Sequence, residues 1–555
     1  MKEYKFSQSD FINILWFLNI SYSFNLLKFN YYMNVKNKKI FYLVFILFLL
    51  FLKIDFRITN DLVCCGDDYD YFSHAETIVE DFDFNYDNQL PNKSRYYSYN
   101  KNAPFGFVGS GILSAPFMYL GILLDKLFNT TYSFQNFKYL MYSFSSIFYL
   151  LFTLRIVERV LLFYDKKINY ILYIFGSGLI YYAFERYSMT HVYEVFTIFL
   201  TIYFSVLFID SKKNQNIYLY LLPFAILLMI LVRWTNFYFA FIPLFLIINS
   251  SKKLPRIRFK NYFVIFISSV INLYFFISLS KSIYGTITFS PSYVYMTGKY
   301  DEYFSSLSIS DLPLLIINFA SDIILILFTN EFGIFWLSPI IFVGFILSIL
   351  NVFISNNLKQ FLFWTYMLMT YITTFYIVSV WKSTAASYGF RYLYCLIPVS
   401  IIVLIKNDFI KFNSVVYRYL NIFSIFSLFS VLFFETTLYS QLSTVDVLNS
   451  FGELRVYSQP EYVTGYIRSI ISIDSYLKIL ATSYLGVFIM YVSFSVFGFE
   501  NVKSFLLQIS NNNDDLNLLI SKLNTLDFEY FLTIFLIALF SSRAVYKKLI
   551  FTPQI

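Results

Sequence analysis

Charged residues are scarce in this sequence. Of its 555 residues, only 14% are Asp, Glu, Lys or Arg, whereas 58% are hydrophobic and 23% are aromatic. A water-soluble domain could not hide so much apolar surface, because even large folds cover much of their surface with polar side chains. The shortage of charge therefore excludes a soluble enzyme or binding module and predicts an all-α polytopic membrane protein.

Cysteine is rarer still. The three cysteines are Cys64, Cys65 and Cys395, and their spacing is not that of a metal site. Adjacent cysteines are poorly placed to bond to each other. We therefore expect no disulfide framework.

Lys and Arg gather in short segments between apolar runs and produce the net charge of +8. By the positive-inside rule such segments face the cytoplasm, so the charge does not imply a nucleic-acid partner. Lys36, Lys38 and Lys39 precede the first clear apolar run, residues 40–54. This predicts a cytoplasmic N-terminus and places the following loop outside, while an earlier apolar run, residues 11–24, is expected at the interface.

Apolar runs of spanning length recur to the C-terminus. About twelve to thirteen spans are predicted, with residues 105–128 and 312–328 lying on or dipping into the outer face, and the side of the C-terminus is left open. The crossings expected after the first are residues 136–163, 168–184, 192–209, 217–232, 236–248, 262–279, 332–350, 361–380, 391–405, 414–434, 476–497 and 528–540.

This topology divides the chain into four segments. Residues 1–39 form a cytoplasmic or interfacial N-terminal segment, and residues 40–434 form a transmembrane module whose first outer loop is 55–135. Residues 435–475 are extracytoplasmic. Residues 476–555 form a C-terminal transmembrane region that contains a polar linker at 511–515.

The first outer loop is strongly acidic. Nine carboxylates lie within residues 61–87, with no Lys or Arg among them. If residues 67–80 are helical, one face carries a cluster from which Asp68 lies about 100° away. This cluster suits a general base or a divalent-cation site, although a solvated acidic loop has the same composition. The residues that share the face are Asp67, Asp70, Tyr71 and His74.

Basic residues stand at the outer ends of several predicted spans. They are Arg186, Arg233, Lys382 and Arg391. Arg near a membrane is costly unless it is paired or lies in a wet cavity, so their convergence points to an anionic ligand such as a lipid phosphate. Interfacial anchoring by snorkelling is the alternative for each one. His191 fits a phosphate partner or a hydrogen-bonded interfacial histidine equally well.

The order of these motifs resembles a known family. Asp67-Asp68-Tyr69-Asp70-Tyr71 outside the first span is followed by a Pro- and Gly-bearing segment at 103–117 and by Ser188-Met189-Thr190-His191. Further along lie Leu231-Val232-Arg233, Tyr284-Gly285-Thr286, a Gly-Ile-Phe-Trp segment at 331–339 and an aromatic segment at 381–393.

Over residues 40–400 this order is similar to the GT-C superfamily of polytopic glycosyltransferases. Within it, the chain resembles the bacterial glycosyltransferase 39 and protein-mannosyltransferase-like branch, which includes the aminoarabinose transferases of lipid A. The chain departs from the aminoarabinose-type signature at Asp70, where that signature has a basic residue. Any phosphate contact must then come from elsewhere. Residues 435–555 match no part of the pattern.

The resemblance implies an inverting transfer of a hexose or pentose in a GT-C-like bundle at the outer face of the bacterial cytoplasmic (inner) membrane. The donor would be a polyprenyl-phosphate-linked sugar and the acceptor a lipid, glycan or protein of the cell envelope, such as lipopolysaccharide. Asp67 would be the catalytic base and Asp68 would orient it. The phosphate contacts would come from Arg186, Arg233 and Arg391, then Lys382 and His191, with support from Asp70, Tyr71 and His74.

A divalent cation, Mg²⁺ or Mn²⁺, is required in some branches of this superfamily and not in others. If one is bound, Asp67 and Asp68 are the expected ligands.

Two other functions stay open. A lipid-linked oligosaccharide flippase would carry charges along a mid-membrane cavity and show repeated halves, neither of which the sequence displays. A polysaccharide polymerase would share the hydrophobicity and the outer arginines, but an acidic first loop is not expected of it.

Overall fold

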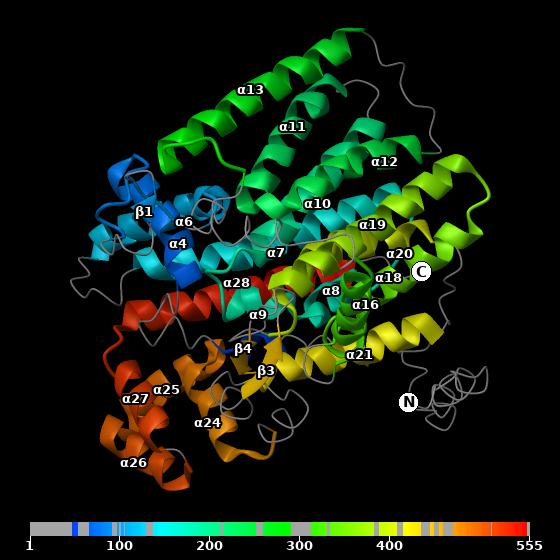
Figure 1. Cartoon of the computed structure of the whole chain (residues 1–555). Coiled ribbons are helices and arrows are strands. Elements are labelled where there is room, and N and C mark those ends of the chain that lie inside the picture. Colours follow the sequence, from blue (N-terminus) through cyan, green and yellow to red (C-terminus); the bar gives the residue numbers. More distant parts are fainter. Residues whose placement is uncertain are drawn as a thin grey trace.

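The computed structural model is built almost entirely of helices (Figure 1). In the part of the chain that it describes, six helices are long and apolar enough to cross a membrane. The prediction of an all-α, multi-pass membrane protein is confirmed. The six helices are α6 (Gly109–Phe128), α10 (His191–Asp210), α13 (Phe259–Tyr284), α19 (Leu358–Trp381), α21 (Val415–Leu432) and α28 (Phe528–Phe551). The described residues are 47–53, 66–90, 97–98, 101–104, 106–128, 137–210, 215–250, 259–289, 312–329, 333–381, 388–407, 415–434, 444–448, 454–458, 470–511 and 513–551.

Two other predicted spans are single helices with bounds close to those expected. They are α7 (Phe137–Phe163) and α11 (Gln215–Val232). The run at 312–328, which we expected to lie on or dip into the outer face, forms the single helix α16 (Leu312–Phe328). The apolar run at 105–128, which we expected on the outer face, forms α6, whose length and composition suit a span. Of the predicted first span, 40–54, only residues 47–53 are described, and the predicted interfacial run 11–24 lies outside the described residues.

Four predicted spans are broken into shorter pieces, and proline or glycine stands at each break. Three of them restart as an α-helix with proline in its first turn, at Pro243, Pro339 and Pro398. Proline suits a helix start because its fixed φ is helical and its missing N–H needs no partner there. The fourth break contains Gly178, whose φ is +87°. The pieces are α8 (Tyr170–Ile174), η4 (Phe175–Leu179), α9 (Ile180–Phe184), η5 (Trp234–Phe241), α12 (Ile242–Ile248), α17 (Ile334–Leu337), α18 (Pro339–Ile354), η7 (Arg391–Leu396) and α20 (Ile397–Lys406).

The C-terminal region also differs from the prediction. The run 476–497 is divided between α24 (Ile473–Thr482) and α25 (Tyr484–Phe497), and the Ser483 hydroxyl accepts a hydrogen bond from the Gly486 N–H at the start of α25. After α26 (Phe499–Ile509), the predicted polar linker already contains the first turn of α27 (Asn513–Leu523). Two antiparallel strand pairs complete the described chain: β1 (Tyr97–Ser98) with β2 (Lys101–Asn102), and β3 (Thr444–Leu448) with β4 (Leu454–Ser458).

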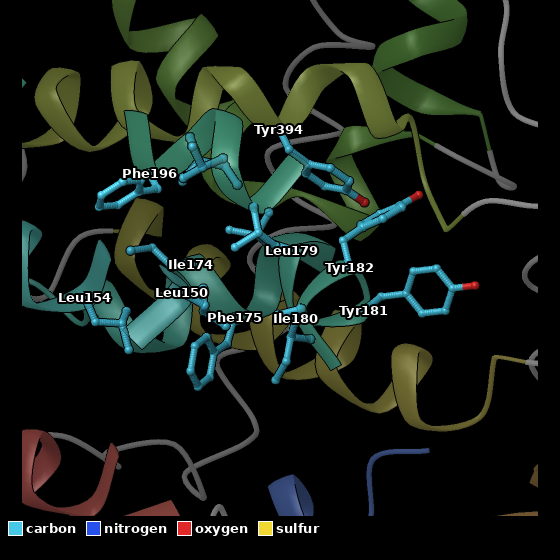
Figure 2. Close-up of a cluster of buried hydrophobic side chains, with 14 of the residues drawn as sticks. Leu150, Leu154, Ile174, Phe175, Leu179, Ile180, Tyr181, Tyr182, Phe196 and Tyr394 are labelled. Atoms are coloured by element: carbon cyan, nitrogen blue, oxygen red, sulfur yellow. The ribbon is translucent and has the colours of Figure 1, made fainter. Parts of the chain in front are cut away.

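The centre of the bundle is an apolar core that ends in a layer of tyrosines. Figure 2 shows Leu and Ile side chains from α7, α8, η4 and α9 packed together, with the hydroxyls of Tyr181, Tyr182 and Tyr394 directed to one side. Two of these hydroxyls donate to the Tyr388 carbonyl, Tyr182 at 3.0 Å and Tyr394 at 2.8 Å. Buried tyrosines need such partners. These bonds hold the segment before η7 against α9 and against η7 itself.

Helix α4 (Gly66–Glu76), which carries the acidic motif, packs beside α6 at one end of the bundle (Figure 1). Its Phe72 and Ala75 bury against Met118 of α6 and Tyr142 of α7. At the far end, the Lys138 ammonium group binds Glu76 at 2.5 Å and Glu80 of the following π-helical turn η3 (Thr77–Asp81) at 2.6 Å. Residues 67–80 are therefore helical, which is the condition on which the shared face of the acidic motif depended.

Candidate functional site

Asp68 joins α4 to the corner between α9 and α10. Its side chain is 1% exposed. The Arg186 guanidinium donates to one carboxylate oxygen at 3.1 Å, and the Ser188 hydroxyl donates to the other at 2.5 Å. One oxygen of this buried carboxylate is thus engaged by a cation and the other by a hydroxyl, which is a strong, charge-assisted arrangement. Asp68 and Arg186, both predicted site residues, therefore form a closed buried pair.

The predicted supporting residues of α4 occupy different environments. The imidazole of His74 is fully buried, with the Tyr86 hydroxyl 2.6 Å from Nδ1 and the Gly106 carbonyl 2.9 Å from Nε2. Burial lowers the pKa of His74 to about 4, so the ring is neutral and belongs to the packing of α4. Asp70 is buried as well. Tyr71 lies against Gly106, where a Cβ atom would overlap the Tyr71 ring.

Two predicted site residues have no described side chain. The backbone of Asp67 lies in α4, one position before Asp68, and its side chain lies outside the described residues. Lys382 lies outside them altogether.

A second carboxylate, Glu194, lies in the first turn of α10. It is 1% exposed, and one oxygen lies 3.5 Å from Arg233 Nη1 and 3.5 Å from His191 Nδ1. Among the described residues, neither this oxygen nor His191 Nδ1 makes a hydrogen bond. The pair of Glu194 and Arg233 is longer and more exposed than the closed pair of Asp68 and Arg186, and we call it the open pair.

Tyr392 of η7 brings Arg233 and Arg391 together. The Arg233 Cζ atom lies 4.0 Å from the centre of the Tyr392 ring, and the Arg391 Cζ atom lies 5.1 Å from it. Arg391 also donates from Nη2 to the Tyr392 hydroxyl at 3.3 Å. The His191 ring lies 6.1 Å from the same ring, edge to face. These five residues, His191, Glu194, Arg233, Arg391 and Tyr392, are called the arginine cluster below.

The arginine cluster adjoins α4. The charges of Arg186, Arg233 and Arg391 all act on His191, and Tyr71 of α4 lies within electrostatic range of Arg233. The fold thus brings five of the predicted site residues to one region. They are Asp68, Arg186, His191, Arg233 and Arg391.

Three contributors were missed in the sequence. Ser188 and Tyr392 carry no signal of their own, because hydroxyl and aromatic residues are common throughout this chain. Glu194 did carry one, since it is the single carboxylate between residues 192 and 209. An ionisable residue inside an apolar span usually serves a site, and this rule could have identified it.

The described residues do not favour a divalent-cation site. Among them, no three His, Cys, Asp or Glu side chains gather as ligands. Both oxygens of Asp68, a predicted ligand, already accept from Arg186 and Ser188. A guanidinium at 3.1 Å would repel a metal ion at the same carboxylate, so we derive no step through a metal.

No protein-family model, no curated protein and no solved structure matches this chain.

Proposed function

We propose that this protein is a membrane glycosyltransferase that moves a sugar from a polyprenyl-phosphate-linked donor to a lipid, glycan or protein acceptor. One observation carries the proposal. Arg233, Arg391 and His191 converge beside the acidic helix α4, so a phosphate-binding group and a carboxylate pair share one region of a membrane protein. The order of motifs that resembles the GT-C superfamily supports the same reaction.

The arginine cluster would bind the donor phosphate. As the bond between the anomeric carbon and the phosphate oxygen breaks, negative charge grows on the leaving group, and nearby guanidinium groups stabilise it. Arg233 suits this task because its side chain is 17% exposed, whereas that of Arg186 is 4% exposed. The polyprenyl phosphate then leaves with the electron pair of the broken bond.

Asp67 would be the general base. It would take the proton from the acceptor hydroxyl as the acceptor oxygen bonds to the anomeric carbon from the opposite face, which inverts the configuration. Asp68 is unsuited to that role, because both of its oxygens are buried and already accept hydrogen bonds from Arg186 and Ser188. Its contribution would be to fix α4, and thereby Asp67, against the corner at 185–190.

We place this reaction on the non-cytoplasmic side of the bacterial cytoplasmic membrane. The topology predicted from the basic segments supports that side, because with residues 105–128 kept on the outer face it puts α4 and the arginine cluster opposite the Lys- and Arg-rich loops. Polyprenyl-linked sugars, envelope acceptors and surrounding membrane lipids would be the partners.

The test compares the glycolipids and glycoproteins of a deletion strain with those of its parent by mass spectrometry. We expect one hexose or pentose to be missing, and its mass would identify the donor and acceptor class. Asp67→Asn should reach the membrane in normal amounts and fail to restore the sugar. Asp514→Asn, at an exposed position of α27, is the matched control and should restore it.

Full restoration by Asp67→Asn would remove Asp67 as the base. Shortened glycan chains in the deletion strain, in place of a single missing sugar, would replace the transferase with a polymerase.

A further inference from the structure

Tyr392 contacts three other members of the arginine cluster, namely Arg233, Arg391 and His191. Its ring lies beneath Arg233 at 4.0 Å and beside Arg391 at 5.1 Å, and its hydroxyl accepts a hydrogen bond from Arg391 at 3.3 Å. Tyr392 itself carries no charge that could bind a phosphate. Its contacts are therefore with the groups that would bind one.

We propose that Tyr392 is a positioning residue, which holds Arg233 and Arg391 side by side so that both face the phosphate of the lipid-linked donor. The proposal rests on the proposed function and extends it to a residue with no direct role in the chemistry.

Two guanidinium groups at one site repel each other, and the repulsion is strong where water is scarce. The face of an aromatic ring carries partial negative charge and attracts a cation placed over it. Tyr392 can offset part of the repulsion in this way. It also restricts the rotamers of Arg233, so less conformational entropy is lost when a ligand binds.

Glu194 restrains Arg233 from another direction. The carboxylate lies 3.5 Å from the guanidinium, and the Arg233 side chain is 17% exposed, so Glu194 attracts Arg233 while part of the guanidinium stays within reach of a ligand. Arg233 is therefore held by a ring and a carboxylate together, and a phosphate could still take up its donors.

The ring, more than the hydroxyl, should carry this role. Both arginines pack near the ring, and the bond to the hydroxyl comes from Arg391 at 3.3 Å. Tyr392→Phe should therefore keep most of the function, and Tyr392→Leu should lose it.

The experiment measures binding of farnesyl phosphate and of uncharged farnesol to the full-length protein in detergent, by native mass spectrometry. We expect the wild type and Tyr392→Phe to prefer the phosphate. Tyr392→Leu should weaken phosphate binding about fivefold to thirtyfold and leave farnesol binding unchanged. Tyr274→Leu, at a 73% exposed tyrosine of α13, is the matched control and should bind as the wild type does.

A purely structural role for Tyr392 would lower the melting temperature and weaken both ligands alike. If Tyr392→Leu does not fold, Tyr392→Met fills a similar volume without a ring and should show the same selective loss. Equal phosphate preference in the wild type and the Leu or Met variant would overturn the role of Tyr392 alone. Equal binding of the two ligands by the wild type would instead overturn the proposed donor.

Discussion

Two carboxylate–arginine pairs lie in the same region of this protein, and they differ in the distance between the charges and in the burial of the arginine. Asp68 accepts hydrogen bonds from Arg186 and Ser188 and is buried on all sides. Glu194 lies 3.5 Å from Arg233, and the Arg233 side chain is 17% exposed. A closed pair fixes one element against another, whereas an open pair leaves donors for a ligand. The first should therefore govern folding and the second binding.

Breaking the closed pair should have the largest effect. Arg186→Met leaves Asp68 as an uncompensated buried charge, which costs about 3 to 5 kcal/mol in comparable pairs. We expect a large fall in the melting temperature of the detergent-solubilised protein and poor accumulation in the membrane. The double variant Asp68→Asn with Arg186→Met should recover part of this loss. A melting temperature close to that of the wild type in Arg186→Met would show that the pair is not an anchor.

Breaking the open pair should affect binding more than folding. Arg233→Gln should reduce transfer, measured by restoration of the missing sugar, by about a hundredfold or more. Its melting temperature should fall less than that of Arg186→Met, because the Arg233 side chain is 17% exposed and lies 3.5 Å from its carboxylate, whereas that of Arg186 is 4% exposed and lies 3.1 Å from its own. Arg543→Gln, at an exposed position of α28, serves as the control. If Arg233→Gln and Arg186→Met lose stability equally, the distinction between the two pairs fails.

A smaller effect on stability should appear when the pH is lowered, through His74 of α4, the helix that the closed pair anchors. The pKa of His74 is about 4 in the folded protein against an ordinary value of 6.5. The unfolded chain therefore binds the proton more readily, and stability is fully present above pH 6.5 and is lost as the pH falls toward 4.

At pH 5 this loss should be about 2 kcal/mol. The check is the difference in melting temperature between pH 7.5 and pH 5. It should shrink in His74→Gln, which can still donate to the Gly106 carbonyl. An unchanged difference in that variant would assign the pH dependence to other groups.

Much of the helical framework could be predicted from the sequence. Predicted spans such as 136–163 and 217–232 lie within two or three residues of α7 and α11, because long apolar runs that must bury their backbone polar groups in a membrane can only be helices. The breaks at Pro243, Pro339 and Pro398 were missed, because hydropathy does not respond to a single proline inside an apolar run.

The candidate site could be predicted in part. The residue types that converge, carboxylates and arginines at the ends of apolar runs, were identified from their cost inside a membrane. Their pairing was not, because Asp68 and Arg186 are separated by 118 residues and only packing decides which charge meets which.

The sequence by itself determined that this chain is a helical, multi-pass membrane protein, because its apolar content leaves no other class. It also determined which residues must find partners, since a charge near lipid cannot remain alone. Only the tertiary structure decided that Asp68 pairs with Arg186 and Ser188, and that Glu194 lies near the partly exposed Arg233. It also decided that the Tyr392 ring packs against both Arg233 and Arg391. These are contacts between distant segments, and they depend on how α4, α10 and η7 pack together.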